Sequence, residues 1–195
     1  MRQQFMTLEK KVVYENRWIK LYENKIKRND SEEIYSVVER SDSVIIIPLT
    51  HSNNTILLQQ YRYPTDSNSW ELPMGGINNG ETKEQAARRE LLEETQLQLS
   101  DLKQIGEYYA VPGLTPQKVS IFIAKVEDYD IDNVYTPKDV DEIQETKKVS
   151  LEEIYEMVAN GIITDGFTLV ALLFLRLYVD SGDSLKTTLY GRHHL

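Results

Sequence analysis

GGINNGETKEQAARRELLEETQL, residues 75–97, is the stretch of the chain that decides the fold. Thr82 and Gln85 within it have the form of a capping box, which predicts a helix that begins near residue 82 and continues to about Thr95. The glycine pair at its start permits tight backbone bends and lets carbonyl groups approach a ligand. The stretch therefore predicts a glycine-rich turn that leads into a helix.

Three glutamates of this helix are predicted to lie on one face. Glu93 and Glu94 follow Glu90 by three and four residues, the spacings at which helical side chains are neighbours. Such like charges cost a helix roughly 0.2–0.5 kcal/mol per pair, and a hard cation with oxygen ligands would turn the repulsion into binding. Arg89 precedes Glu93 by four residues and is placed to hold its carboxylate. For a pair of glutamates by itself, a solvated acidic face is the alternative.

Composition narrows the class of protein. The chain has 195 residues, no cysteine and a formal net charge of −9. The length suits one domain with a small extension, and the lack of cysteine fits a reducing cytoplasm. An acidic chain argues against a nucleic-acid partner, and an anionic substrate would need a divalent metal between the two. The N-terminus has no apolar signal segment, and the apolar stretch 167–179 is too short to span a membrane.

The other elements follow from alternation, turns and caps. We expect strands at 11–14, 19–27, 34–39, 43–49, 55–61, 70–72, 102–109 and 119–125, a long acidic loop at 128–145, and helices at 150–161 and 167–179. Ser150 and Glu153 have the form of a second capping box, and the run at 43–49 predicts a strand buried on both faces. Antiparallel-looking strands mixed with helices predict an α+β fold, with residues 1–42 as an N-terminal β extension and 43–195 as the main domain.

The stretch 75–97 resembles the Nudix box, in which glycine, five residues, glutamate and seven residues precede Arg-Glu, an aliphatic, any residue, Glu-Glu, any residue, glycine and an aliphatic. The positions in register are Gly75, Glu81, Arg89, Glu90, Leu91, Glu93, Glu94 and Leu97. Gln96 stands where the family has the glycine that usually ends the helix, which concerns the C-cap and not the metal ligands. The resemblance implies a Nudix fold, a mixed β-sheet sandwiched between helices.

The resemblance also implies a metal site. In the family, the box holds Mg²⁺ or Mn²⁺ against a diphosphate. Carried over to this chain, Glu90, Glu93, Glu94 and the backbone carbonyl of Met74 are the expected ligands. Mg²⁺ is the expected cofactor, with Mn²⁺ as a possible substitute. Such an ion neutralises phosphate oxygens and activates water, so no nucleophilic side chain is required.

Segments outside the box resemble the ADP-ribose pyrophosphatase subfamily. They are Trp70-Glu-Leu-Pro-Met-Gly75, the Pro112-Gly113 pair fifteen residues after Leu97, Gln60-Tyr-Arg62 and residues 163–173. The resemblance covers about residues 10–178. It implies substrate-binding roles for Arg62, Glu71, Pro112 and Gly113. Each segment taken singly has a structural alternative, such as a simple turn for the Pro-Gly pair.

The N-terminal strands resemble segments that bind the nucleotide in the human member of the subfamily. Residues 17–21 and 35–40 match these segments, which implies that Trp18 and Tyr35 stack on adenine and that Arg40 binds phosphate. The subfamily exchanges these strands across a homodimer, so a homodimer is the expected assembly. The alternative is that Trp18 is an ordinary aromatic residue of a core.

A base that deprotonates the attacking water is implied in the loop before the penultimate helix. The matching segment is Asp139-Val-Asp-Glu-Ile-Gln-Glu145, in which Glu142 is the first choice and Asp141 the second. A solvated acidic loop is the alternative, and Glu93 could then act as base. The expected catalytic residues are therefore Arg89, Glu93 and Glu142.

The expected reaction is hydrolysis of ADP-ribose to AMP and ribose 5-phosphate in the cytoplasm, with no nucleic-acid or membrane partner. A related enzyme for another nucleotide sugar, such as GDP-mannose, would share every metal ligand and differ only in base contacts. A non-catalytic Nudix sensor is the alternative from another class. Sensors usually have a degraded box and an added DNA-binding domain, whereas this box retains all its acids.

Overall fold

The computed structural model describes residues 5–127 and 143–180. By its internal contacts the chain divides into two compact units. Of the described residues, the first contains 5–42 and 108–119, and the second contains 43–107, 120–127 and 143–180. The predicted extension therefore shares its unit with a segment that lies far away in the sequence.

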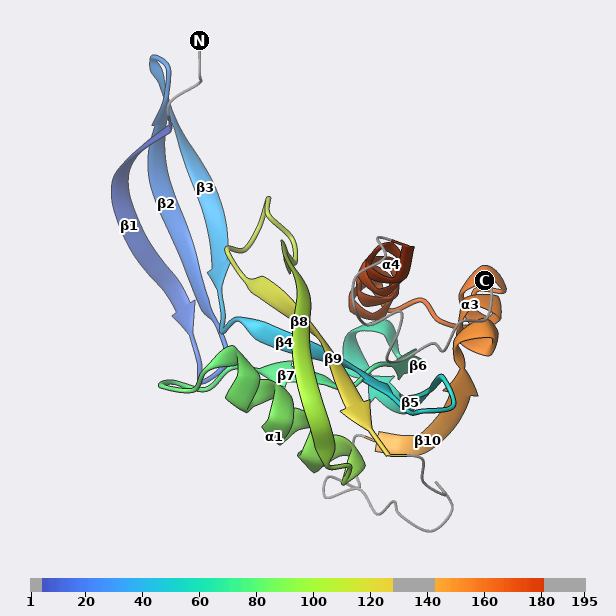
Figure 1. Cartoon of the computed structure of the whole chain (residues 1–195). Helices are drawn as coiled ribbons and strands as arrows, with labels where there is room; N and C mark the ends of the chain where they lie inside the picture. Colours follow the sequence, from blue (N-terminus) through green and yellow to red (C-terminus); the bar gives the residue numbers. More distant parts are fainter. Residues whose placement is uncertain (1–4, 128–142, 181–195) are drawn as a thin grey trace. The chain divides into compact units, whose positions relative to one another are not determined.

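Three antiparallel strands form the sheet of the first unit (Figure 1). They are β1 (Phe5–Glu15), β2 (Lys20–Arg28) and β3 (Ser31–Glu39). Strand β1 is longer than the predicted 11–14, and all of its residues are exposed. The strand extends beyond its apolar residues because its backbone pairs with β2 from Phe5 to Glu15. The turn between β2 and β3 uses Asn29 at φ 55°, a left-handed conformation that asparagine tolerates.

A four-stranded sheet forms the centre of the second unit. Its order is β7 (Met74–Gly76), β4 (Ser43–Leu49), β9 (Lys118–Val126) and β8 (Leu99–Tyr109). All seven residues of β4 are buried, which confirms the prediction of a strand covered on both faces. Helix α1 (Lys83–Thr95) packs against β4 and β7, and α4 (Gly166–Asp180) also contacts β4. This mixed sheet with helices packed against it confirms the predicted α+β fold.

Alternation along β4 explains how it serves both helices. Val44 and Ile46 join Ala86, Ala87 and Leu91 of α1 in one apolar core. Because successive side chains of a strand point to opposite faces, Ile45 and Ile47 face the other side. These four side chains of β4 are fully buried. The core therefore fixes α1 against the sheet, and this sets the position of the acidic face of the helix.

A second sheet of this unit has the order β10 (Ile143–Ser150), β5 (Asn54–Arg62) and β6 (Ser67–Glu71). A 3₁₀ turn, Tyr63–Thr65, joins β5 to β6. The prediction of a loop as far as Glu145 is wrong at its end, because Ile143 already pairs with Gln60. The exposed polar positions of β10 hid this strand, since tertiary pairing overrides weak propensity. The rest of the predicted loop, 128–142, lies outside the described residues.

The helix caps follow local sequence closely. The Thr82–Gln85 capping box is present in both directions, as predicted. Helix α3 (Leu151–Ala159) has Ser150 as N-cap, but the carboxylate of Glu153 bonds the Lys147 ammonium at 2.7 Å. The second capping box is therefore confirmed only in its Ser150 half. Within the described residues, no helix has the length and apolar character to cross a membrane.

Candidate active site

Strand β7 and helix α1 bring the box residues together. The glycine at 75 lies directly against the carboxyl group of Glu90, and a Cβ at this position would overlap that group. Its neighbour Gly76 has open space where a Cβ would be. Glycine at 75 is therefore required by close approach and not by a positive φ, which occurs only at Gly80 and Gly161 among the described glycines. The buried position of Glu90 depends on this gap.

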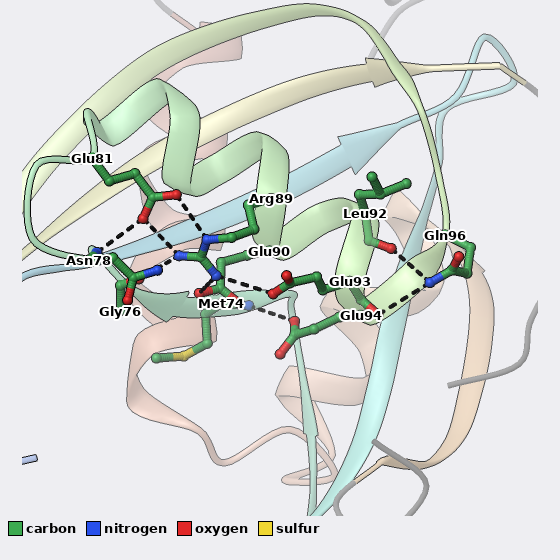
Figure 2. Close-up of polar contacts among 10 residues, drawn as sticks. All are labelled: Met74, Gly76, Asn78, Glu81, Arg89, Glu90, Leu92, Glu93, Glu94 and Gln96. Atoms are coloured by element: carbon green, nitrogen blue, oxygen red, sulfur yellow. Dashed lines mark hydrogen bonds and ion pairs between the residues drawn. The ribbon is translucent and has the colours of Figure 1, made fainter. Parts of the chain in front are cut away.

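Arg89 is the centre of an ion-pair network (Figure 2). Its Nε and Nη2 donate to the two oxygens of Glu81 at 2.8 and 2.9 Å. Its Nη1 donates to Glu90 at 2.7 Å and to Glu93 at 3.2 Å, and Nη2 also donates to the Gly76 carbonyl at 2.8 Å. The predicted Arg89–Glu93 contact is confirmed. The guanidinium joins β7, the loop before α1 and the helix itself, so it orients two of the predicted ligands.

Glu81 belongs to this network, although it was not predicted as a site residue. It also accepts the Asn78 backbone N–H at 3.0 Å. The hydrogen bonds from Arg89 and then from Asn78 lower the pKa of Glu81 to about 2, so it stays ionised. Its place in the box register was the available signal, but the register does not say that Arg89 is its partner. The two residues are eight apart and belong to a loop and a helix.

The third acid, Glu94, lies in a different environment. Its Oε2 accepts the Met74 backbone N–H at 3.0 Å, which ties it to β7 (Figure 2). Burial is the main cause that raises the pKa of Glu94 to about 8, followed by repulsion from Glu90. Burial also raises the pKa of Glu90, against the opposing effect of Arg89. A cation bound between these two carboxylates would offset the cost of ionising them.

The donor set fits a hard divalent cation. Glu90, Glu93 and Glu94 supply carboxylate oxygens from one face, and β7 brings the backbone of Met74 to the same face. Oxygen ligands of this kind suit Mg²⁺ and Mn²⁺. As the described residues stand, no three acidic, histidine or cysteine side chains converge on one point. Arg89 is paired with Glu90 and Glu93, so these two side chains would have to turn toward an ion in order to bind it.

The predicted substrate residues of the second unit form a pair. Arg62, at the end of β5, donates from Nε to Oε1 of Glu71 at 2.8 Å and from Nη2 to Oε2. The side chain of Glu71 is 2% exposed and that of Arg62 is 40% exposed. Both also act on the charge of Glu94, which Arg62 stabilises and Glu71 opposes. The pair therefore lies within electrostatic reach of the acidic face.

The remaining predicted substrate residues belong to the first unit. The Tyr35 hydroxyl donates to the Gly113 carbonyl at 3.0 Å, which brings two of them together. Arg40 and Pro112 are exposed. Trp18 is 65% exposed, and the guanidinium of Arg17 lies 3.9 Å from the ring centroid. This exposure rules out the alternative that Trp18 belongs to a core.

Two further predictions cannot be placed. Glu142, the first choice for the base, and Asp141, the second, lie outside the described residues. Glu93, the remaining choice, has a side chain that is 49% exposed and paired with Arg89.

Gln96 ends α1 in the geometry that glycine would adopt. Its φ of 59° is left-handed, and its backbone N–H donates to the Leu92 carbonyl at 2.9 Å. The side-chain amide donates to the same carbonyl at 3.0 Å (Figure 2). The departure from the box therefore leaves the cap geometry intact. The extra side-chain bond offsets part of the cost that a left-handed conformation imposes on a residue with a Cβ.

Gln96→Gly is expected to stabilise the protein by about 0.5–1 kcal/mol, because glycine adopts this φ without strain. Thermal unfolding should show a Tm higher by about 1–4 °C. Gln98→Gly is the matched control, since Gln98 is exposed and has no positive φ. That change should leave the Tm unchanged or lower it. A fall in Tm for Gln96→Gly would mean that the side-chain hydrogen bond outweighs the strain.

Comparisons with known proteins agree with this geometry. The model of the NUDIX domain family matches residues 39–165. The chain is 28% identical over 172 residues to an ADP-ribose pyrophosphatase of Bacillus subtilis, a match that covers 88% of this chain and 92% of that protein. It is 30% identical over 156 residues to a GDP-mannose pyrophosphatase of Yersinia enterocolitica, which covers 75% and 80%.

A solved structure described as an ADP compounds hydrolase has the same fold. Its TM-score is 0.76 at 20% identity, and the match covers 93% of this chain and 97% of that one. The chain therefore belongs to the Nudix family, and it is a Nudix hydrolase. Within the family it is similar to proteins named ADP-ribose pyrophosphatase, as its segments outside the box predicted.

Proposed function

We propose that this Nudix hydrolase cleaves the diphosphate of ADP-ribose to give AMP and ribose 5-phosphate, with Mg²⁺ as cofactor. The observation that carries the proposal is the acidic face of α1, on which Arg89 orients Glu90 and Glu93 while β7 holds Glu94. The similarity to a protein named ADP-ribose pyrophosphatase over 88% of the chain supports the choice of substrate.

The chain's own residues have distinct roles in this reaction. Glu90, Glu93, Glu94 and the Met74 carbonyl hold the divalent ion, for which Mn²⁺ is the possible substitute. When bound, the ion neutralises charge on the diphosphate and lowers the pKa of a bound water. Arg89 keeps the ligands oriented, as residues behind a metal ligand commonly do. Glu142 is proposed as the base, with Asp141 and Glu93 as the other choices.

Adenine recognition is proposed for Trp18 and Tyr35, phosphate binding for Arg40, and further substrate contacts for Pro112 and Gly113. The strand register bears on how the two rings could meet. Tyr35 pairs with Asn24, whereas Lys20, two residues after Trp18, pairs with Glu39. These rungs are four residues apart, or ~13 Å at 3.3 Å per residue.

Two rings on one base are about 7 Å apart, twice the usual contact distance. Trp18 lies in the turn before β2, beyond the rung of Lys20, so in one protomer the two rings start from backbone positions that are well separated along the hairpin. A sandwich formed by Trp18 of one protomer and Tyr35 of its partner avoids this separation. This supports the proposal that the protein is a homodimer in which each nucleotide site uses both chains.

Trp18→Ala is expected to lower kcat/KM for ADP-ribose by about 10- to 100-fold. Stacking on an aromatic side chain is worth about 1–3 kcal/mol per base in nucleic-acid complexes. The loss should appear mainly in KM, because adenine is remote from the breaking bond and is held alike in ground and transition states. Steady-state kinetics of the two proteins would measure this difference.

Phe5→Ala is the matched control. Phe5 is an exposed aromatic of the same unit, with the guanidinium of Arg28 4.9 Å from its ring centroid. It has no proposed contact with substrate, so its loss should change kcat/KM by less than about twofold. A folded Trp18→Ala protein with an unchanged KM would contradict the adenine site.

A second candidate substrate is another nucleotide sugar, because one relative is named GDP-mannose pyrophosphatase. The two candidate substrates would share the metal face, and an aromatic clamp stacks on any base. Neither part of the site therefore separates the two candidates. A panel that compares kcat/KM for ADP-ribose and GDP-mannose in Mg²⁺ tests the proposal. ADP-ribose should be preferred at least about tenfold, which corresponds to ~1.4 kcal/mol. Preference for GDP-mannose would replace the substrate and leave the metal chemistry in place.

A further inference from the structure

Glu71 and Arg62 differ sharply in exposure. The side chain of Glu71 is 2% exposed, whereas that of Arg62, to which it is paired, is 40% exposed. A substrate can therefore reach Arg62 but not Glu71. A charged group in a buried position such as that of Glu71 is costly unless it is paired.

The pairing uses a fixed geometry. Both oxygens of Glu71 accept from Arg62, one from Nε and one from Nη2. Such a two-point contact fixes the plane of the guanidinium as well as its position. The two strands are paired, with Leu58 opposite Glu71 and Arg62 on the same face of β5 as Leu58. Arg62 therefore lies along β5 with its head group held at the start of the turn to β7.

This place borders the acidic face of α1. Glu71 is three residues before Met74, whose N–H holds Glu94. Arg62 and Glu71 both act electrostatically on Glu94, with opposite signs. A partly exposed arginine side chain within electrostatic reach of Glu94 is placed to bind an oxygen of an anionic substrate.

We propose that Glu71 is a positioning residue, which acts on the reaction through Arg62 by holding the guanidinium in the orientation that binds the diphosphate. The inference rests on the proposed function for the identity of the anion. It assigns Glu71 no contact with substrate. Its consequence is that the two side chains act as one unit, so the loss of either removes the same contribution.

A double-mutant cycle tests this with Glu71→Gln, Arg62→Ala and the double variant. Glutamine keeps the shape of Glu71 but loses the charge and one acceptor. Each single change should lower kcat/KM about 10- to 100-fold, as is typical for residues that orient a contact group. Most of the loss should fall on kcat, because charge on the diphosphate oxygens changes in the transition state. In the Arg62→Ala background, Glu71→Gln should have less than about a twofold further effect.

Asp180→Asn is the control for the loss of an arginine–carboxylate pair, since Arg176 and Asp180 pair at 3.1 Å with both side chains about half exposed. It should leave kcat and KM unchanged. Arg62→Lys provides a measurement that spares the buried acid. It keeps the charge but cannot form the two-point contact, and kcat should still fall about tenfold or more.

If the losses in the two single variants multiply in the double variant, or if Arg62→Lys has a normal kcat, the positioning role is overturned. The proposed function would still stand in either case, provided that the parent protein is active. A lowered Tm with normal kcat in folded Glu71→Gln would show a structural role only and would also overturn it. A parent that hydrolyses no nucleotide sugar would contradict the proposed function, and the positioning role would fall with it.

Discussion

Glu94→Gln is expected to lower kcat for a nucleotide sugar by about 10²–10³-fold, the scale on which one group that stabilises transition-state charge contributes. The partly buried carboxylate is a proposed metal ligand, and glutamine removes its charge while keeping its size. The Met74 N–H that donates to Oε2 would retain an amide oxygen as acceptor. Steady-state kinetics at saturating Mg²⁺, together with the Tm, would measure the effect.

The fold should survive this change, because Glu94 is costly to ionise where it lies. Glu84→Gln is the matched control, since it removes a glutamate from the exposed first turn of the same helix. It should alter stability by only a few tenths of a kcal/mol and leave kcat unchanged. A Glu94→Gln protein with a near-normal kcat would remove Glu94 from the ligand set.

Gly75→Ala is expected to lower kcat/KM by about 10²-fold. The added Cβ would overlap the Glu90 carboxyl group, so either that side chain or strand β7 must move. Such a displacement disturbs a proposed metal ligand and its pair with Arg89 at once. Losses of 10- to 100-fold are usual when the groups behind a metal ligand are disturbed, and here the ligand itself shifts. Activity and apparent Mg²⁺ affinity should both fall.

Gly76→Ala gives an unusually close control, because it adds the same methyl group one residue later. Nothing lies within 4 Å of its Cβ position, and its carbonyl remains available to Arg89. Its activity should stay within about twofold of the parent. Equal losses in the two variants would show that glycine is needed for the backbone of β7 and not for the room beside Glu90.

Features set by neighbouring residues could be predicted from the sequence. The Thr82–Gln85 box begins α1 where expected, because its hydrogen bonds close within one helical turn. The buried strand β4 follows from its apolar run. The common face of the three glutamates follows from helical spacing alone. These parts need no knowledge of what packs against them.

Features that depend on distant partners could not be predicted in this way. Strand β10 exists because β5 pairs with it, although its own sequence is largely polar. The Glu153 carboxylate bonds Lys147 instead of the backbone at the start of α3. The Tyr35–Gly113 bond joins residues 78 apart and explains why 108–119 belongs to the first unit. The pairing of buried Glu71 with Arg62 likewise joins two strands, and neither residue's own sequence neighbours indicate it.

The most direct test of the account is hydrolysis of ADP-ribose by the intact protein after removal of divalent ions with a chelator. The account predicts no turnover in chelator and full recovery when Mg²⁺ is added in excess, with AMP and ribose 5-phosphate as the products in equal amounts. Undiminished hydrolysis in chelator would contradict the assignment of the acidic face of α1 as a metal site that carries the reaction.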